Sequence, residues 1–137
     1  MSFGDPVPGH ETSTFTAVHG FAFGPTGDDD GSWFGSFEVT DAERQPYGIV
    51  HGGMYSALAE AVASMGTAMA VLPEGNIALG QSNNTTFLRP TFEGTVEALA
   101  VPIHRGRTSW VWRVDMTNGD KRVAHSIVTL AVRPKQS

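Results

Sequence analysis

Residues 51–75 read HGGMYSALAEAVASMGTAMAVLPEG and contain the strongest periodic pattern in the chain. Apolar side chains recur there at steps of three and four residues, which is the spacing of one face of an α-helix. They are Leu58, Val62, Met65, Met69 and Leu72. Pro73 and Gly75 are residues that end helices. We therefore predict one helix over 53–72, roughly 30 Å long at about 1.5 Å per residue.

Glu60 is the only charged residue between Gly52 and Leu72. A helix on the surface normally carries a charged stripe, so this pattern predicts a helix that is buried on most sides. Burial of an isolated carboxylate costs free energy unless the group gains a specific partner or stays protonated. An exposed groove or a subunit contact would explain Glu60 equally well. A polar stripe follows the same face of the helix: Ser56, Glu60, Ser64 and Thr67.

The predicted helix begins just after His51-Gly52-Gly53. Unpaired backbone N–H groups at a helix start favour negative charge, and glycine lets a ligand approach closely. Such a site suits a carbonyl oxygen that becomes an oxyanion; the alternative is a tight turn that only requires glycine. Glu60 follows Gly52 by two helical turns, about 12 Å. One helix cannot bring both groups to one reacting atom, so a second subunit would have to supply one of them.

The segments around this helix are rich in β-branched and aromatic residues and alternate in polarity, as strands do. We predict strands over 14–23, 33–40, 77–88, 95–104, 108–116 and 122–132, with a loop or short irregular helix over 41–50. Turns are expected at 24–31, at Gly106 and at Asn118-Gly119. Two strands, one helix and an antiparallel meander of about four strands indicate an α+β protein. The economical packing is an antiparallel sheet wrapped around one long central helix, the hotdog fold.

The length of 137 residues predicts a single domain over 1–137, in which residues 1–12 form a loose N-terminus. The chain has no cysteine, which excludes disulfides, iron–sulfur clusters and cysteine nucleophiles. We expect no metal, because no histidine pair has a ligand spacing such as HExxH. No signal peptide or membrane span is recognisable, so we expect a cytoplasmic protein without a membrane contact.

The net charge of −5 is unevenly distributed along the chain. Residues 1–88 carry ten acidic residues and one basic residue, whereas residues 89–137 carry four acidic and eight basic residues. A basic C-terminal third leaves room for a small phosphorylated ligand. Nucleic acid is not an expected partner, since the chain has no lysine-rich run and no nucleic-acid motif.

Four segments resemble the hotdog-fold acyl-CoA thioesterases. The likeness is closest to the 4-hydroxybenzoyl-CoA thioesterases of the Arthrobacter type, with the phenylacetyl-CoA thioesterases nearby, and it covers about residues 40–134. The segments are QPYGIVHGG at 45–53 followed by SALAE at 56–60, GQSNNTTFLRP at 80–90, IHRGRTSW at 103–110 and AVRP at 131–134.

The resemblance implies a catalytic role for four residues. Glu60 matches the carboxylate that acts as nucleophile or as general base for water, and the Gly52 N–H matches the donor that polarises the thioester carbonyl. Gln45 matches a side chain near that carbonyl. Ser64 stands where the relatives have threonine, a hydroxyl that helps to place the carboxylate or the water.

The resemblance also implies acyl-CoA as substrate, with an aryl or arylacetyl acyl group, and no further cofactor. Arg89 and the Arg107-Thr108 turn fall where the family contacts the CoA phosphates, and His51 and Gly53 are expected to contact substrate beside Gly52. The family builds its site at a dimer interface, usually in a tetramer of two dimers. Three residues are candidates for the acyl pocket: Phe37, Tyr47 and Met54.

Two other functions remain open from the residues alone. A non-catalytic acyl-CoA-binding regulator would keep the basic contacts but would not need Glu60. A hotdog hydratase or dehydratase would pair a catalytic histidine with an acid, and His51 lies at the wrong end of the helix for that. No serine stands in a GxSxG motif, so an α/β-hydrolase is not indicated.

Overall fold

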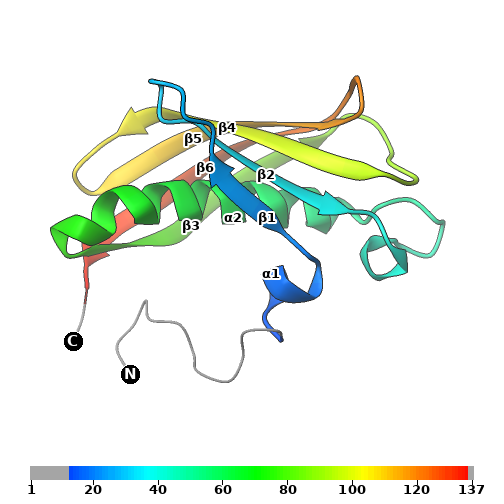
Figure 1. Ribbon diagram of the computed structural model, residues 1–137, viewed down its shortest axis with the longest axis horizontal. Helices are drawn as coiled ribbons and strands as arrows, with labels where there is room; N and C mark the ends of the chain where they lie inside the picture. The colour runs from blue at the N-terminus through cyan, green and yellow to red at the C-terminus, as the bar shows by residue number, and fades with distance from the viewer. Residues whose placement is uncertain (1–12, 136–137) are drawn as a thin grey trace.

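The computed structural model describes residues 13–135, and the predicted loose N-terminus over 1–12 lies outside them. Figure 1 shows the elements along the chain. In order, they are α1 (Phe15–Val18), β1 (Ala22–Pro25), β2 (Trp33–Glu38), η1 (Asp41–Glu43), α2 (Gly52–Val71), η2 (Leu72–Glu74), β3 (Asn76–Phe87), β4 (Thr95–Arg105), β5 (Ser109–Asn118) and β6 (Lys121–Pro134).

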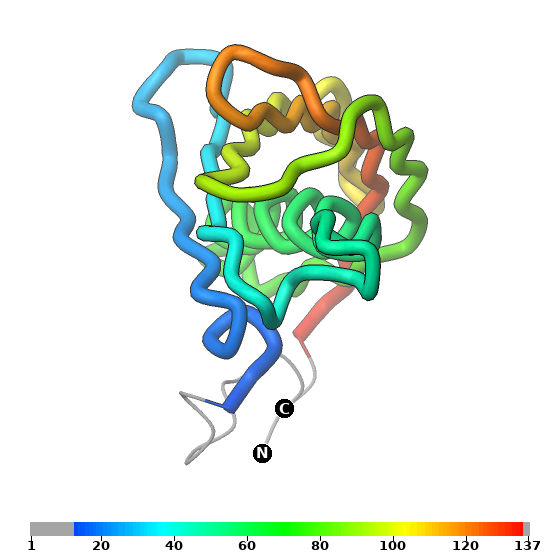
Figure 2. The backbone as a smooth tube through the Cα atoms, turned by 90° about the vertical axis from the view of Figure 1, so that its right-hand side faces the viewer, coloured from blue at the N-terminus to red at the C-terminus, as the bar shows by residue number. Residues whose placement is uncertain are grey.

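Six strands form one antiparallel sheet in the order β1-β2-β4-β5-β6-β3. The sheet curves over α2, which runs along its concave side (Figures 1 and 2). This is the predicted α+β hotdog fold, a sheet wrapped around one long helix.

The predicted meander of four strands is wrong in one respect. Only β4, β5 and β6 follow one another in the sheet, whereas β3 lies at the far edge and pairs with β6. The reason is that α2 crosses under the sheet after β2. The next strand is therefore added at the opposite edge, and β4 returns to pair with β2.

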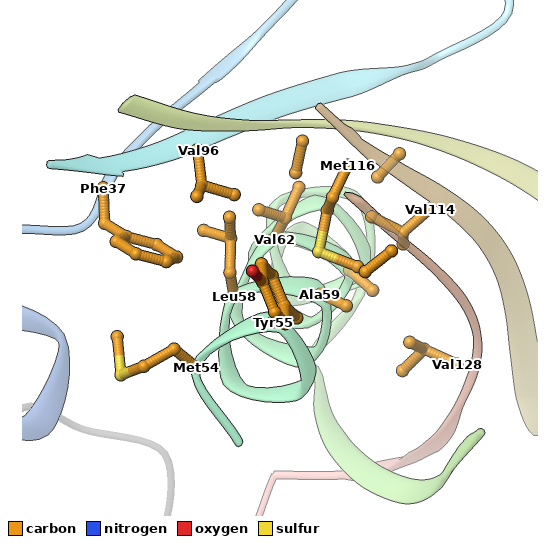
Figure 3. Close-up of a cluster of buried hydrophobic side chains, with 14 of the residues drawn as sticks. Phe37, Met54, Tyr55, Leu58, Ala59, Val62, Val96, Val114, Met116 and Val128 are labelled. Carbon is orange, nitrogen blue, oxygen red and sulfur yellow. The ribbon is translucent and has the colours of Figure 1, made fainter. Parts of the chain in front are cut away.

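The core lies between α2 and the concave side of the sheet (Figure 3). Leu58, Val62 and Ala59 of α2 are fully buried there. Trp112 of β5 is also fully buried, and its indole N–H donates to Thr67 Oγ1 at 2.8 Å. Thr67 therefore belongs to the core and not to an outward polar stripe.

The prediction that α2 is buried on most sides is wrong for the single chain. The sheet covers one side of the helix only, and Met65, Met69 and Leu72 are between 39% and 56% exposed. Residues Gly52–Glu74 are apolar and long enough to cross a membrane by composition, but this segment includes the helix that packs on the sheet. A core helix meets that criterion as readily as a membrane span.

The predicted strand over 14–23 is also wrong in its first half. Thr14 caps the short helix α1, with its hydroxyl accepting from the Ala17 N–H, and β1 begins only at Ala22. The aromatic and β-branched residues that suggest a strand instead make ring contacts, with Phe15 and Phe21 centroids 5.9 Å apart. Local composition does not report such contacts.

Candidate active site

A side chain caps the N-terminus of α2. His51 is the N-cap, and its Nδ1 accepts the N–H of Gly53 at 2.9 Å. The N–H of Met54 donates to the His51 carbonyl at 2.9 Å. Among residues 13–135 no acceptor pairs with the N–H of Gly52. The helix start thus keeps one unpaired donor, at the residue predicted to polarise a carbonyl.

Gln45 stands in a closed turn just before the helix. Its backbone N–H donates to the Ile49 carbonyl at 2.8 Å, and Gly48 closes the turn with a φ of +88°. The side-chain oxygen of Gln45 accepts the Tyr47 N–H. Because a backbone N–H can only donate, the amide oxygen must face Tyr47, which leaves the amide NH₂ of Gln45 to donate elsewhere.

These donors share one cavity, which we call the helix-start pocket, of about 440 Å³. Its described lining is Gln45, Ile49, Val50, Gly52, Tyr55, Phe87, Leu88, Arg89 and Pro90. The Phe87 ring lies so close to Gly52 that an added Cβ would meet it at 3.0 Å. Glycine is therefore the residue that fits between the ring and the helix start.

Glu60 lines a different cavity, an open groove of about 540 Å³ that we call the Glu60 groove. Its described lining is Phe15, Thr16, Phe21, Ser56, Ala57, Glu60, Ala61 and Asn83. Glu60 is exposed, so the expectation of a buried acid is wrong for the single chain, and the alternative of an exposed groove is the one observed. The physical reason is that the sheet covers the opposite side of α2.

The Glu60 carboxylate lies over the backbone of β3. A Cβ added to Gly80 would meet Glu60 Oε2 at 2.8 Å, so glycine leaves the space that the carboxylate occupies. Ser64, one turn further along α2, is half-buried. Among the described residues, no hydrogen bond joins either Ser56 or Ser64 to Glu60, and no donor is bound to its carboxylate. The carboxylate is left to solvent or to a reacting molecule.

The two cavities confirm the separation of Glu60 from Gly52 that the helical spacing predicted. Gln45, Gly52 and Arg89 are brought together in the helix-start pocket, and Glu60 is not among its described lining residues. Within one chain, therefore, Glu60 and Gly52 line different cavities.

Arg89 and Arg107 lie at opposite ends of the sheet. Arg89 shares a small cavity with Asn118 and Lys121 at the β5–β6 turn, whereas Arg107 and Thr108 stand in the β4–β5 turn (Figure 1). The 11 residues of β4 run between these ends, about 35 Å for an extended strand. One chain does not bring both arginines to one set of phosphates.

Sequence reasoning missed a buried contact between Glu43 and His19 behind the helix start. Glu43 is 3% exposed; its Oε2 lies 2.7 Å from His19 Nδ1, and its Oε1 accepts from the backbone and hydroxyl of Thr40. Burial raises the pKa of the Glu43 carboxyl, but the hydrogen bonds from His19 and Thr40 outweigh it and leave the pKa below its ordinary value. The Glu43 carbonyl accepts the His51 N–H at 2.8 Å, so α1 is connected to the cap of α2.

Two of the three acyl-pocket candidates are core residues. Phe37 is 1% exposed and Met54 is 5% exposed, and both belong to the cluster under the sheet (Figure 3). Tyr47, at 91% exposure, lies outside both cavities. Across residues 13–135, no group of three or more histidine and acidic side chains could hold a metal ion.

Comparisons with known proteins agree with this architecture. The chain matches the Thioesterase superfamily over residues 47–125. It is 37% identical over 100 residues to the 1,4-dihydroxy-2-naphthoyl-CoA hydrolase of Listeria monocytogenes. The matched residues cover 72% of this chain and 80% of that relative. A crystal structure of a mutant thioesterase from Pseudomonas aeruginosa is 31% identical, has a TM-score of 0.84, and covers 90% of this chain and 88% of that one.

A thioesterase of Haemophilus influenzae is similar to the chain as well, with 34% identity and a TM-score of 0.80 over 90% of this chain and 85% of that one. The chain belongs to the Thioesterase superfamily. It is a hotdog-fold thioester hydrolase, as the relatives' names and the shared fold support. The closer likeness to the Arthrobacter-type group stays a prediction.

Proposed function

We propose that this protein hydrolyses an aryl- or arylacetyl-CoA to the free acid and CoA, in a site that two copies of the chain build together. The observation that carries the proposal is that the candidate catalytic groups are distributed over two separate cavities. One holds the unpaired Gly52 N–H with Gln45, and the other holds Glu60. The helix-start pocket has hydrogen-bond donors but no acid among its described lining residues, and the Glu60 groove has the acid but not these donors.

The exposed side of α2 supports a second copy as the partner. That side carries apolar residues beyond the Glu60 groove, among them Met65 and Met69, and Glu60 as its single charge. Beside it, β3 is one edge of the sheet and, among the described residues, pairs with a strand on one side only. An uncharged helix face next to an open edge of 12 residues suits a symmetric contact. A tetramer of two such dimers completes the proposal.

The chemistry follows from the residue types. The Gly52 N–H, with the amide NH₂ of Gln45 nearby, donates to the thioester oxygen as negative charge develops on it. Glu60 of the other copy then acts in one of two ways. As general base it takes a proton from water, whose oxygen attacks the carbonyl carbon. As nucleophile its own oxygen attacks, and water hydrolyses the resulting anhydride. In both cases the C–S bond breaks, and CoA leaves as a thiolate that needs no strong acid.

Ser64 is proposed to help place the carboxylate or the water, since it lies one turn from Glu60 on the same helix. Arg89, beside the helix-start pocket, is proposed to bind the CoA phosphates together with Arg107 and Thr108. Because these lie at the other end of the sheet, a further copy would have to bring them to the same nucleotide. His51 and Gly53 would contact substrate only at the edge, since they are paired with each other.

The aromatic acyl group is supported by the Listeria relative, which is named for a bicyclic aryl-CoA. The proposed substrate, a CoA thioester, is a cytoplasmic metabolite. We therefore propose a cytoplasmic enzyme that needs no cofactor beyond the CoA of its substrate.

The test is release of free thiol from a panel of acyl-CoAs by the wild type, by Glu60→Ala and by Glu74→Ala as a matched control. Glu74 is an exposed glutamate in η2, outside both cavities. We expect thiol release by the wild type and the control, and a loss of about 10²–10⁴-fold in Glu60→Ala. Equal release by Glu60→Ala would overturn the role of Glu60, and CoA binding without release would favour a binding protein.

A further inference from the structure

The helix α1 has no evident role in the core. None of its residues is buried, and Phe15 and Val18 are 54% and 58% exposed. Apolar side chains that stay exposed beside a cavity often belong to a binding site. Phe15 lines the Glu60 groove, and Val18 does not.

Despite its exposure, α1 is held firmly in place. His19, which follows it, is paired with the buried Glu43 at 2.7 Å. The Phe15 ring lies 4.5 Å from the His19 ring and 5.9 Å from Phe21, and Phe21 lies 5.7 Å from the buried Phe37. The aromatic side of the groove is therefore connected both to the core and, through Glu43, to the cap of α2.

The α2 and β3 residues that line the groove are small or polar. Ala57 and Ala61 project only methyl groups into it, one turn apart on α2. Asn83 of β3 is fixed by its own hydrogen bonds, donating to the Ser56 carbonyl at 2.9 Å and accepting from Thr85 at 2.8 Å. Two phenyl rings, two alanine methyl groups and the Glu60 carboxylate thus line the same groove.

We propose that the Glu60 groove receives the acyl group of the substrate, and that Phe15 and Phe21 of the N-terminal segment select an aromatic ring there. The inference rests on the proposed function, because it places the reacting carbonyl beside Glu60. A groove of about 540 Å³ lies within the usual size of ligand pockets and accommodates a one- or two-ring acyl group. Ring–ring contacts favour a planar aromatic group over a flexible alkyl chain of equal carbon number, which loses rotational freedom on binding.

The experiment compares phenylacetyl-CoA with octanoyl-CoA, which carry acyl groups of equal carbon number. The quantity measured is the ratio of kcat/KM for the two substrates. We expect the wild type to prefer phenylacetyl-CoA, and Phe15→Ala to reduce that preference about tenfold, the size of one favourable ring contact. Phe15→Tyr keeps the ring and should keep the preference. Phe21→Leu, which keeps apolar volume at a half-buried position, should also reduce it.

Val18→Ala is the matched control, since Val18 is equally exposed on the same helix but does not line the groove. It should leave the ratio unchanged. A ratio that stays the same in both Phe15→Ala and Phe21→Leu overturns the inference and leaves the proposed function intact, because both substrates are still hydrolysed. A wild type that releases no thiol from any acyl-CoA overturns the proposed function and this inference with it.

Discussion

The helix-start pocket and the Glu60 groove differ in how completely one chain builds them. Beside the helix-start pocket, His51 Nδ1 accepts the Gly53 N–H and the Gln45 side-chain oxygen accepts the Tyr47 N–H, which leaves the Gly52 N–H and the Gln45 NH₂ as donors that line the pocket. In the Glu60 groove, the carboxylate has no hydrogen-bond donor among the described residues and lies exposed on an uncovered side of α2. On the proposed roles, a single chain therefore positions the donors for the thioester oxygen, whereas the surroundings of Glu60 require a second copy to complete them.

Mixing two inactive variants tests that difference most strongly. We expect Glu60→Ala and Gln45→Ala each to be nearly inactive as pure proteins. Each proposed site takes Glu60 from one copy and Gln45 from the other, so half of the sites in a mixed dimer are intact. After unfolding and refolding together, the mixture should recover about one quarter of wild-type thiol release.

Without refolding, the two variants combined at low concentration serve as the control and should stay inactive as long as subunits do not exchange. If the refolded mixture forms hybrid dimers, seen by mass spectrometry with one variant tagged, and still releases no thiol, the shared site is wrong.

Substitution of Gly80 tests whether catalysis requires the Glu60 carboxylate to lie in the space that this glycine of β3 leaves open. In Gly80→Val the added side chain takes the space of the carboxylate, because even a Cβ would lie 2.8 Å from Oε2. We expect kcat to fall about 10²-fold through misplacement of the acid, with little change in KM. Thr86→Val, at an exposed position of β3 that lines neither described cavity, is the control for a valine side chain on the same strand. Unchanged kcat in a folded Gly80→Val protein would contradict the observed placement of Glu60.

Arg89 tests the anion-binding side of the helix-start pocket. We expect Arg89→Ala to raise KM for acyl-CoA about tenfold with little change in kcat, since a phosphate contact binds substrate and transition state alike. Substrates truncated to the pantetheine portion should show no difference between variant and wild type. Lys135→Ala, a basic residue near the C-terminal end of the described chain, is the charge-matched control. An equal rise in KM for the truncated substrate would exclude phosphate binding by Arg89.

The Glu43–His19 pair should affect stability more than chemistry. Because the folded-state pKa of Glu43 is lowered, its contribution is complete above the ordinary carboxyl value of 4.5 and is lost as pH falls through the lower folded-state pKa. We expect Glu43→Gln to lower the free energy of unfolding, measured with urea at pH 7, by about 1–3 kcal/mol. This deficit should shrink below about pH 4.5. Glu74→Gln, the control, should change neither the free energy of unfolding nor its dependence on pH. If the Glu43→Gln variant is destabilised equally at every pH, the effect comes from packing and not from the charge of Glu43.

Local pattern predicted the elements that depend on few distant contacts. The period of Leu58, Val62 and their neighbours identified α2 to within one residue at each end, because a helix satisfies its backbone within its own segment. The same pattern marked Glu60 as unusual. It could not tell whether that side of the helix is covered, because this depends on where strands far away in the sequence lie.

The N-terminal segment illustrates the opposite case. Phe15, Phe21 and His19 were predicted to lie in a strand, and no local signal marked them as part of a cavity. Their clustered aromatic rings were the one available hint, but only the pairing of His19 with Glu43, 24 positions away, places α1 over the groove. Phe37 and Met54, two of the candidates for the acyl pocket, are instead buried in the core.

The sequence by itself determined the central helix, the antiparallel strands around it, the donor at the helix start and the one acid two turns further on. These follow from periodicity, turn residues and helical spacing, which are local properties. Only the tertiary structure decided that β3 joins the far edge, that Gly52 and Glu60 face different cavities, and that an aromatic N-terminal segment borders the acid. Those outcomes depend on contacts between residues far apart in the chain, where the curvature of the sheet and the packing of α2 choose which faces are covered.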